Sequence, residues 1–227
     1  MALLKGHWQL LLLTTLVFAL WQTPVVVPLK ILIVFFHEAS HAIATILTGG
    51  KVLSLSISAN QGGEVWSQGG NRFITLTASY LGSLLIGIGL LIAATRTTAD
   101  RAIMGGCGVI TLLIAAFYIR DLFALGFIVG TGGAMLLIAR FLGHAANDMA
   151  LRVMGLASII YVPYDIFSDT IARSNLRSDA YMLAEEFGGT TVMWGGTWLV
   201  LSVIVIVCCL RYGPGRSSNL AFRRPQT

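Results

Sequence analysis

Long apolar runs separated by short polar gaps dominate the pattern of this chain. A helix needs about 20 mostly apolar residues to cross the hydrocarbon core of a bilayer. Seven runs approach that length, and they cover residues 8–27, 29–47, 76–94, 102–119, 122–141, 149–167 and 192–210. The fourth and fifth runs are separated only by Arg120-Asp121, so a single re-entrant pair is an alternative for them. The pattern predicts an all-α polytopic membrane protein with about six to seven transmembrane helices.

The first run resembles the apolar part of a signal peptide, because Lys5 precedes it. However, it leaves through Trp21-Gln22-Thr23-Pro24 and lacks the small residues of a cleavage site. We therefore interpret it as a retained membrane anchor.

Residues 51–75 interrupt the helical pattern after the second run. Residues 51–58 alternate apolar and polar side chains with the period of two that is typical of a strand, and Gly-Gly pairs at 62–63 and 69–70 indicate turns before residues 72–75. We expect a small β-hairpin or meander here. Because exposed strand edges are not tolerated in hydrocarbon, it has to lie at the membrane interface or line a cavity covered by protein.

A second interruption lies between the last two runs. Residues 179–187 read as a short amphipathic helix, with Asp179 as its N-cap and Gly188-Gly189 as its stop.

The composition supports a membrane protein. The chain of 227 residues is 56% hydrophobic and only 11% charged, whereas soluble domains carry about 25% charged residues. The net charge of +5 does not indicate nucleic-acid binding, because the basic residues stand singly in the gaps and gather late, in the tail 211–227. We treat residues 1–227 as one integral-membrane domain with a basic C-terminal tail.

Seven spans would place the two termini on opposite sides of the membrane. A cytoplasmic C-terminus puts more of the Lys and Arg residues on the inner side, which favours this orientation. An even number of spans would change it.

The second apolar run carries the candidate catalytic and metal-binding residues, in the stretch His37-Glu38-Ala39-Ser40-His41. His37 and His41 are four residues apart and fall on one face of a helix. In an HExxH helix the two imidazoles bind zinc and the glutamate is the general base, while a fourth position of the metal holds water. A charged Glu38 in the middle of a membrane helix costs about 3 kcal/mol and requires partners or a function. The alternative is that these groups only stabilise helix packing through hydrogen bonds.

This arrangement resembles the site-2 protease family of intramembrane zinc metalloproteases, in particular its smaller, bacterial M50B-type branch. The matching segments lie within roughly residues 29–200, and they are residues 36–42, 48–50 with the hairpin after them, 78–83 and 164–169. The resemblance implies a zinc-dependent peptidase that cuts peptide bonds within or next to the bilayer, as in regulated intramembrane proteolysis. It also implies a multi-pass protein of the bacterial inner membrane.

The resemblance further implies a third zinc ligand, an aspartate on a later transmembrane segment in an Asp-Gly context that this chain lacks. The candidates are Asp165 and Asp169, which share one helix face. Pro163 would break the helix just before them, and such breaks are tolerated only beside protein or a watery cavity. We favour Asp165, which is nearer to the proline, with Asp169 as the alternative. A solvated loop in which Asp169 pairs with Arg173 is the other interpretation.

A second departure concerns the family's Gly-Pro-x-x-Asn element, which helps to hold the substrate strand. Residues 82–85 read Gly-Ser-Leu-Leu, so no substrate-clamping or oxyanion-stabilising asparagine is carried over. Asn60 in the hairpin is the polar residue we name as a candidate for substrate binding. The hairpin itself is suited to accept an extended substrate as an added strand.

These features together predict an intramembrane zinc metalloendopeptidase in which Glu38 takes a proton from the zinc-bound water and passes it to the leaving amine. Its partners would be a membrane-protein or peptide substrate and the lipid bilayer, and not nucleic acid. The missing Asp-Gly and Asn elements motivate a first alternative, a non-catalytic scaffold derived from a protease. A metal-ion carrier is the second, although its ionisable groups should line a path through the bilayer and here they cluster at one depth.

Overall fold

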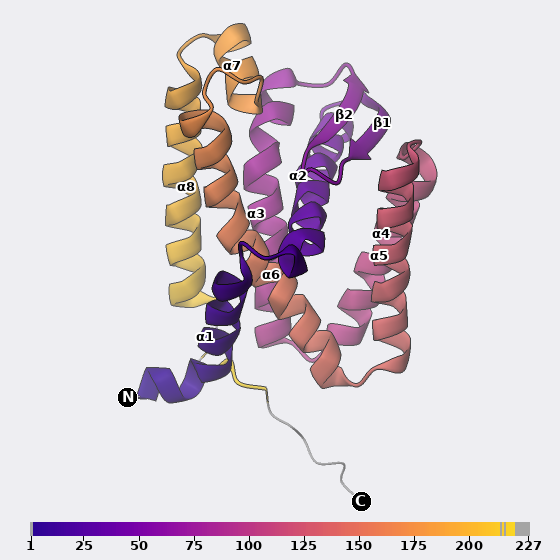
Figure 1. Ribbon diagram of the computed structural model, residues 1–227, viewed down its shortest axis with the longest axis vertical. Coiled ribbons are helices and arrows are strands. Elements are labelled where there is room, and N and C mark those ends of the chain that lie inside the picture. Colours follow the sequence, from indigo (N-terminus) through magenta and orange to yellow (C-terminus); the bar gives the residue numbers. More distant parts are fainter. Residues whose placement is uncertain (1, 214, 216, 221–227) are drawn as a thin grey trace, which may run out of the picture.

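The computed structural model describes residues 2–213, 215 and 217–220. Several of its long helices run roughly along one direction, and a small sheet and a short helix lie at one end of the bundle (Figure 1). The helices are α1 (Ala2–Leu20), α2 (Val27–Leu47), α3 (Arg72–Arg96), α4 (Asp100–Tyr118), α5 (Leu122–Phe141), α6 (His144–Phe167), α7 (Asp179–Phe187) and α8 (Thr191–Tyr212). A 3-10 turn, η1 (Pro24–Val26), precedes α2, and a wider π-helical turn, η2 (Ser168–Ala172), continues α6.

Within the described residues, six helical stretches are long and apolar enough to span a membrane. They are Pro24–Leu47, Arg72–Arg96, Asp100–Tyr118, Leu122–Phe141, His144–Ala172 and Thr191–Tyr212. The predicted fold class, an all-α membrane protein with six to seven spans, is therefore confirmed, and the number of candidate spans among these residues is six. The helices α4 and α5, which the re-entrant alternative would pair, are two candidate spans of 19 and 20 residues that pack side by side.

The prediction of a continuous first span over residues 8–27 is wrong. The helix α1 kinks at His7 and ends at Leu20, before η1 and Pro28 redirect the chain into α2. In Figure 1, α1 rises only from the lower end of the bundle to about its middle. The physical reason is proline, which lacks the backbone N–H of a helix interior and favours a new helix start instead.

The predicted hairpin is present but shorter than residues 51–75. The strands β1 (Lys51–Ile57) and β2 (Gly63–Gln68) pair in antiparallel register, with Leu55 opposite Val65. Residues 72–75 form the first turn of α3 instead of a third strand. The cause is an N-cap, since the Asn71 side chain accepts the Ile74 N–H at 3.1 Å.

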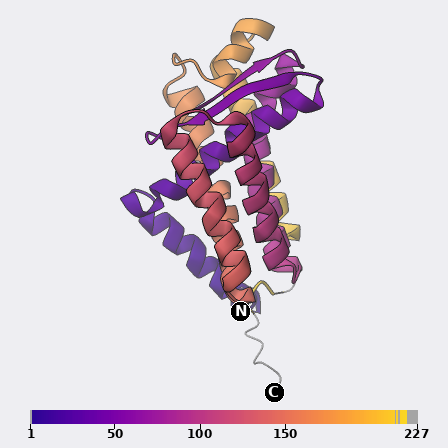
Figure 2. The same cartoon turned by 90° about the vertical axis from the view of Figure 1, so that its right-hand side faces the viewer.

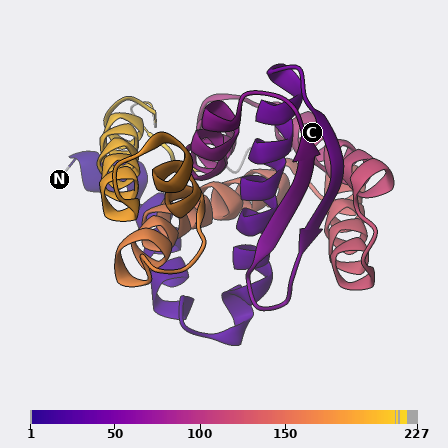
Figure 3. The ribbon, with the colours of Figure 1, turned by 90° about the horizontal axis from the view of Figure 1, so that it is seen from above.

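The helix α3 lies at the centre of the bundle and packs against α2 and α6, and more lightly against α7 and α8. Its buried side chains include Leu76, Leu84 and Leu91. The sheet lies beside the C-terminal half of α2, and α4 and α5 stand beyond the sheet (Figures 2 and 3). The short helix α7 packs on α8 on the opposite side of α2, so α2 and α3 lie between the sheet and α7.

The two terminal segments lie at the same end of the bundle, the end opposite the sheet (Figure 1). The Ser218 N–H donates to the Gly6 carbonyl at 2.9 Å, and the Leu220 N–H donates to the Gln9 side chain at 2.6 Å. The expectation of termini on opposite sides depended on seven spans, and it is not supported by this arrangement. Most of the predicted basic tail 211–227, namely residues 214, 216 and 221–227, lies outside the described residues.

Candidate metal centre and peptidase site

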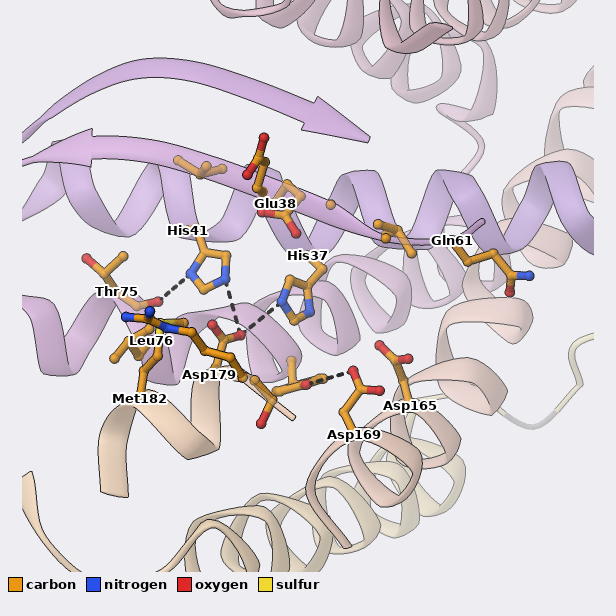
Figure 4. Close-up of a pocket in the computed structure, with 18 of the residues that line it drawn as sticks. His37, Glu38, His41, Gln61, Thr75, Leu76, Asp165, Asp169, Asp179 and Met182 are labelled. Atoms are coloured by element: carbon orange, nitrogen blue, oxygen red, sulfur yellow. Dashed lines mark hydrogen bonds and ion pairs between the residues drawn. The ribbon is translucent and has the colours of Figure 1, made fainter. Parts of the chain in front are cut away.

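Two histidines and one aspartate form a tight cluster at the end of the bundle that carries the sheet and α7 (Figure 4). His37 and His41 lie one turn apart on α2, and Asp179 is the first residue of α7. The Nε2 atoms of His37 and His41 lie 3.0 Å and 3.2 Å from the same oxygen, Oδ2 of Asp179. All three side chains are at least 87% buried, with exposures of 13%, 10% and 8%.

These separations suit a metal ion. Zinc binds histidine nitrogen and carboxylate oxygen at about 2.1 Å in a tetrahedral arrangement, so neighbouring ligand atoms stand about 3.4 Å apart. The distances of 3.0 Å and 3.2 Å are close to that value, and the candidate ligand atoms all lie within 4.8 Å of one another.

The hydrogen bonding of His41 gives a second indication. Its Nδ1 lies 2.9 Å from the carbonyl oxygen of Thr75, which can only accept, so Nδ1 carries a proton. A neutral His41 therefore presents the lone pair of Nε2 to the carboxylate of Asp179. Two acceptors facing each other at this distance need a cation between them, either a proton on the imidazole or a metal ion. A backbone carbonyl that fixes the tautomer in this way is the usual second contact of a metal-binding histidine.

Asp179 reaches the histidines because another residue caps its helix. The sequence predicts Asp179 itself as the N-cap of α7, but the cap is Ser178, whose Oγ accepts the Tyr181 N–H at 3.3 Å. The carboxylate of Asp179 is therefore free to face α2. Burial alone would raise the pKa of Asp179, but the adjacent His41 and His37 hold that pKa well below its ordinary value. Asp179 is thus an anion at neutral pH, as a metal ligand must be.

The expected third ligands do not contact the histidines. Asp165 and Asp169 line the same cavity, but from α6 and η2, and Figure 4 shows them to one side of the imidazole pair, whereas the carboxylate of Asp179 faces both imidazoles. Asp169 is instead paired with Arg173 and accepts a hydrogen bond from the Tyr80 hydroxyl. Pro163 does not break the helix as expected, because α6 continues through it to Phe167.

Glu38 lies beside the histidines under the start of β2. Its side chain is 5% exposed and lines the cavity. A Cβ atom added to Gly63 would stand 2.5 Å from Oε1 of Glu38, so a larger residue here would force the Glu38 side chain to move. The first residue of β2 therefore fixes the position of the glutamate that follows the first histidine.

The segment 78–83 of α3 packs along the HExxH helix. The ring of Tyr80 stands edge-on to the imidazole of His37, with 4.6 Å between centroids and 85° between planes. A Cβ atom at Gly82 would meet Oγ of Ser40 at 2.5 Å, so the two helices approach closely here. The segment that resembles the family pattern thus lies beside the cluster of His37, His41 and Asp179.

A cavity of about 1070 Å³ opens in front of these residues. The helices α2, α3 and α6 form its inner walls, α7 closes one side and the strand β2 borders the other. Asn60, the candidate for substrate binding, lies exposed in the hairpin turn at the border of this cavity. Its contact with a substrate stays a prediction.

Comparison with known proteins agrees with this architecture. The family model described as Peptidase M50B-like matches residues 10–209. No curated protein and no solved structure matches the chain. Together with the six apolar helices, the family match identifies a multi-pass integral membrane protein. The family model covers most of the sequence and includes both the HExxH helix and Asp179, so the chain belongs to the peptidase M50B-like family.

Proposed function

We propose that this protein is an intramembrane zinc metalloendopeptidase, with His37, His41 and Asp179 as the zinc ligands and Glu38 as the general base. The observation that carries the proposal is the shared carboxylate oxygen of Asp179, 3.0 Å and 3.2 Å from the two Nε2 atoms. This assignment replaces Asp165 with Asp179 as the third ligand. Family membership supports a membrane metallopeptidase in general.

The protein side chains have separate tasks in this mechanism. A zinc ion held by the three ligands would supply a polarised water molecule and a Lewis acid for the substrate carbonyl. Glu38 follows His37 directly in the chain, so its carboxylate borders the same cavity and is placed to take a proton from the water. As the peptide C–N bond breaks, Glu38 returns that proton to the leaving nitrogen. The Thr75 carbonyl orients His41, and Ser178 leaves Asp179 free to bind.

The substrate would bind as an extended strand along β2. In the two-stranded sheet one edge of β2 pairs with β1, and among the described residues no strand pairs with its other edge. Because β2 also borders the cavity, a peptide added to that edge would pass in front of Glu38. An extended substrate exposes the carbonyl groups that a helix hides, as hydrolysis requires.

The experiment that tests this function compares two matched carboxylate variants in detergent or proteoliposomes. Glu38→Gln should bind about one zinc per chain and lose cleavage of an unfolded or membrane-anchored peptide. Glu185→Gln, an exposed position on α7, should keep both. A wild-type protein that takes up zinc and never cleaves such peptides would favour the non-catalytic scaffold.

A further inference from the structure

Tyr80 is a buried residue beside the cluster of His37, His41 and Asp179. Its phenol group has no role in the mechanism proposed above. It is 2% exposed, and it lines the same cavity as Glu38. Its ring is fixed on two sides, edge-on to His37 at 4.6 Å and tilted against Trp198 at 5.3 Å between centroids. A polar hydroxyl held at this place by a rigid ring requires an explanation, because burying it is costly unless a partner is found.

In this structure the Tyr80 hydroxyl is hydrogen-bonded to Asp169, a carboxylate that also has an ion pair with Arg173. The Tyr80 hydroxyl donates to Oδ2 of Asp169 at 3.2 Å, while Oδ1 of Asp169 is paired with Arg173. Hydrogen bonds from a hydroxyl to a carboxylate are normally 2.5–2.7 Å long. The bond is therefore a weak one, and Asp169 keeps its ion pair with Arg173 if the hydroxyl turns away.

Peptide hydrolysis needs a donor for the oxygen that becomes negatively charged. Preorganised hydrogen-bond donors at that position are often the largest single contribution to catalysis. The asparagine that the family resemblance would supply for this task is missing from residues 82–85. Tyr80 lies on the same helix, two residues before Gly82, and its ring touches a metal ligand.

We propose that Tyr80 is a catalytic residue whose hydroxyl stabilises the oxyanion of the tetrahedral intermediate, and that Asp169 and Arg173 are positioning residues that hold it in the resting enzyme. The inference rests on the proposed peptidase function. When the water oxygen bonds to the scissile carbon, the carbonyl π pair moves to its oxygen. Tyr80 then exchanges Asp169 for this stronger acceptor. Its proton stays on the phenol oxygen, and Glu38 carries the proton of the water to the leaving nitrogen as the C–N bond breaks.

The kinetic test uses Tyr80→Phe, which keeps the ring and removes one oxygen. The variant should lose 10²–10³-fold in kcat, the usual loss for one oxyanion donor, with KM and zinc content unchanged. Tyr118→Phe is the matched control, because Tyr118 lies on α4 and does not line the cavity. It should behave as wild type. Loss of zinc or of thermal stability in Tyr80→Phe would mean that the hydroxyl is structural, and would overturn the proposal.

A binding measurement gives a readout that does not depend on turnover. A phosphinic peptide presents a tetrahedral anionic group, and its affinity for the zinc-loaded chain should fall about 100-fold in Tyr80→Phe. The matching substrate peptide, measured in the Glu38→Gln background so that it is not cleaved, should bind equally well with and without the hydroxyl. Equal affinities of wild type and Tyr80→Phe for the phosphinic peptide would overturn the role of Tyr80.

The two proposals fail in different ways. If the protein takes up no zinc, or if cleavage does not depend on Glu38, the peptidase function fails. If zinc and Glu38 behave as expected while Tyr80→Phe turns over like wild type, only the role of Tyr80 fails. A zinc-loaded wild-type chain that does not bind the phosphinic peptide contradicts both.

Discussion

Ser178 and Asp179 are neighbours in the chain, and their side chains contact different elements. Oγ of Ser178 caps α7 through the Tyr181 N–H at 3.3 Å, while the carboxylate of Asp179 contacts both histidines of α2. Either residue type is a good N-cap. Because the serine caps the helix, the aspartate is available to the histidines and to the zinc ion that we propose they bind.

Removing the cap should therefore weaken metal binding. In Ser178→Ala, Asp179 becomes the nearest acceptor for the free N–H groups of α7. Capping the helix then competes with metal binding for the same carboxylate. We expect zinc affinity to fall about tenfold, at the lower end for residues that orient metal ligands. Chelator competition measures the zinc Kd. Ser178→Asn keeps a capping acceptor and should bind zinc nearly as well as wild type, whereas unchanged affinity in Ser178→Ala would refute this division of tasks.

Gly63 and Gly62 form a matched pair for testing the position of Glu38. A Cβ atom at Gly63 would stand 2.5 Å from the Glu38 carboxylate, whereas one at Gly62 would meet only Oγ of Ser58, at 3.3 Å. Gly63→Ala should displace the general base and reduce kcat by about 10²-fold, with zinc content unchanged, since misplacements of about 1 Å have effects of this size. Gly62→Ala should keep most of the activity. Equal activities of the two variants in a peptide-cleavage assay would contradict the claim that Gly63 sets the position of the Glu38 carboxylate.

Asp121, in the loop between α4 and α5, forms a hydrogen bond with the sheet. The Ser56 hydroxyl donates to Oδ2 of Asp121 at 2.7 Å, and Oδ1 of the same residue accepts the Ala124 N–H at 2.8 Å. Ser56→Ala should lower the free energy of unfolding by about 1 kcal/mol. Asp121→Ala removes the cap of α5 as well and should cost about 2 kcal/mol. Thermal unfolding in detergent ranks the two variants, and the reverse order would exclude the double role of Asp121.

The opposite end of the bundle contains a buried ion pair. Arg152 and Asp148 are each 3% exposed, and Arg152 also donates to the Ser218 carbonyl. Arg152→Met leaves a buried carboxylate without its cation and should destabilise the protein by about 3–5 kcal/mol. The double variant Asp148→Leu/Arg152→Met should recover much of this loss. A single variant that melts at the wild-type temperature would show that the pair contributes little.

The sequence was sufficient to predict most of the fold, because apolar length and turn residues decide it locally. Residues 122–141 and 179–187 were predicted with the bounds that α5 and α7 have. The prediction of the first span is wrong because Pro24 lies inside the apolar run of residues 8–27 and Pro28 follows directly after it, and apolar character alone does not reveal where the helix stops. The prediction of extended structure for residues 72–75 is also wrong. Their composition is typical of a strand, but the Asn71 side chain caps a helix that begins there.

The site could be predicted only where its residues share one element. The HExxH spacing places His37, Glu38 and His41 together without knowledge of the tertiary fold. Asp179 is 142 residues away from His37, and only tertiary packing brings α7 to α2. The available hint was the dipeptide Ser178-Asp179 before an amphipathic helix, which offers two capping residues where one is needed. The sequence does not indicate which of the two is the cap.

The zinc content of aspartate variants tests the central claim most directly. Wild type, Asp165→Ala, Asp169→Ala and Asp179→Ala would be purified under the same conditions, and metal per chain would be measured by mass spectrometry. We expect about one zinc in the first three proteins and almost none in Asp179→Ala. Full zinc in Asp179→Ala together with its loss in Asp165→Ala would show that α6, and not α7, completes the metal site.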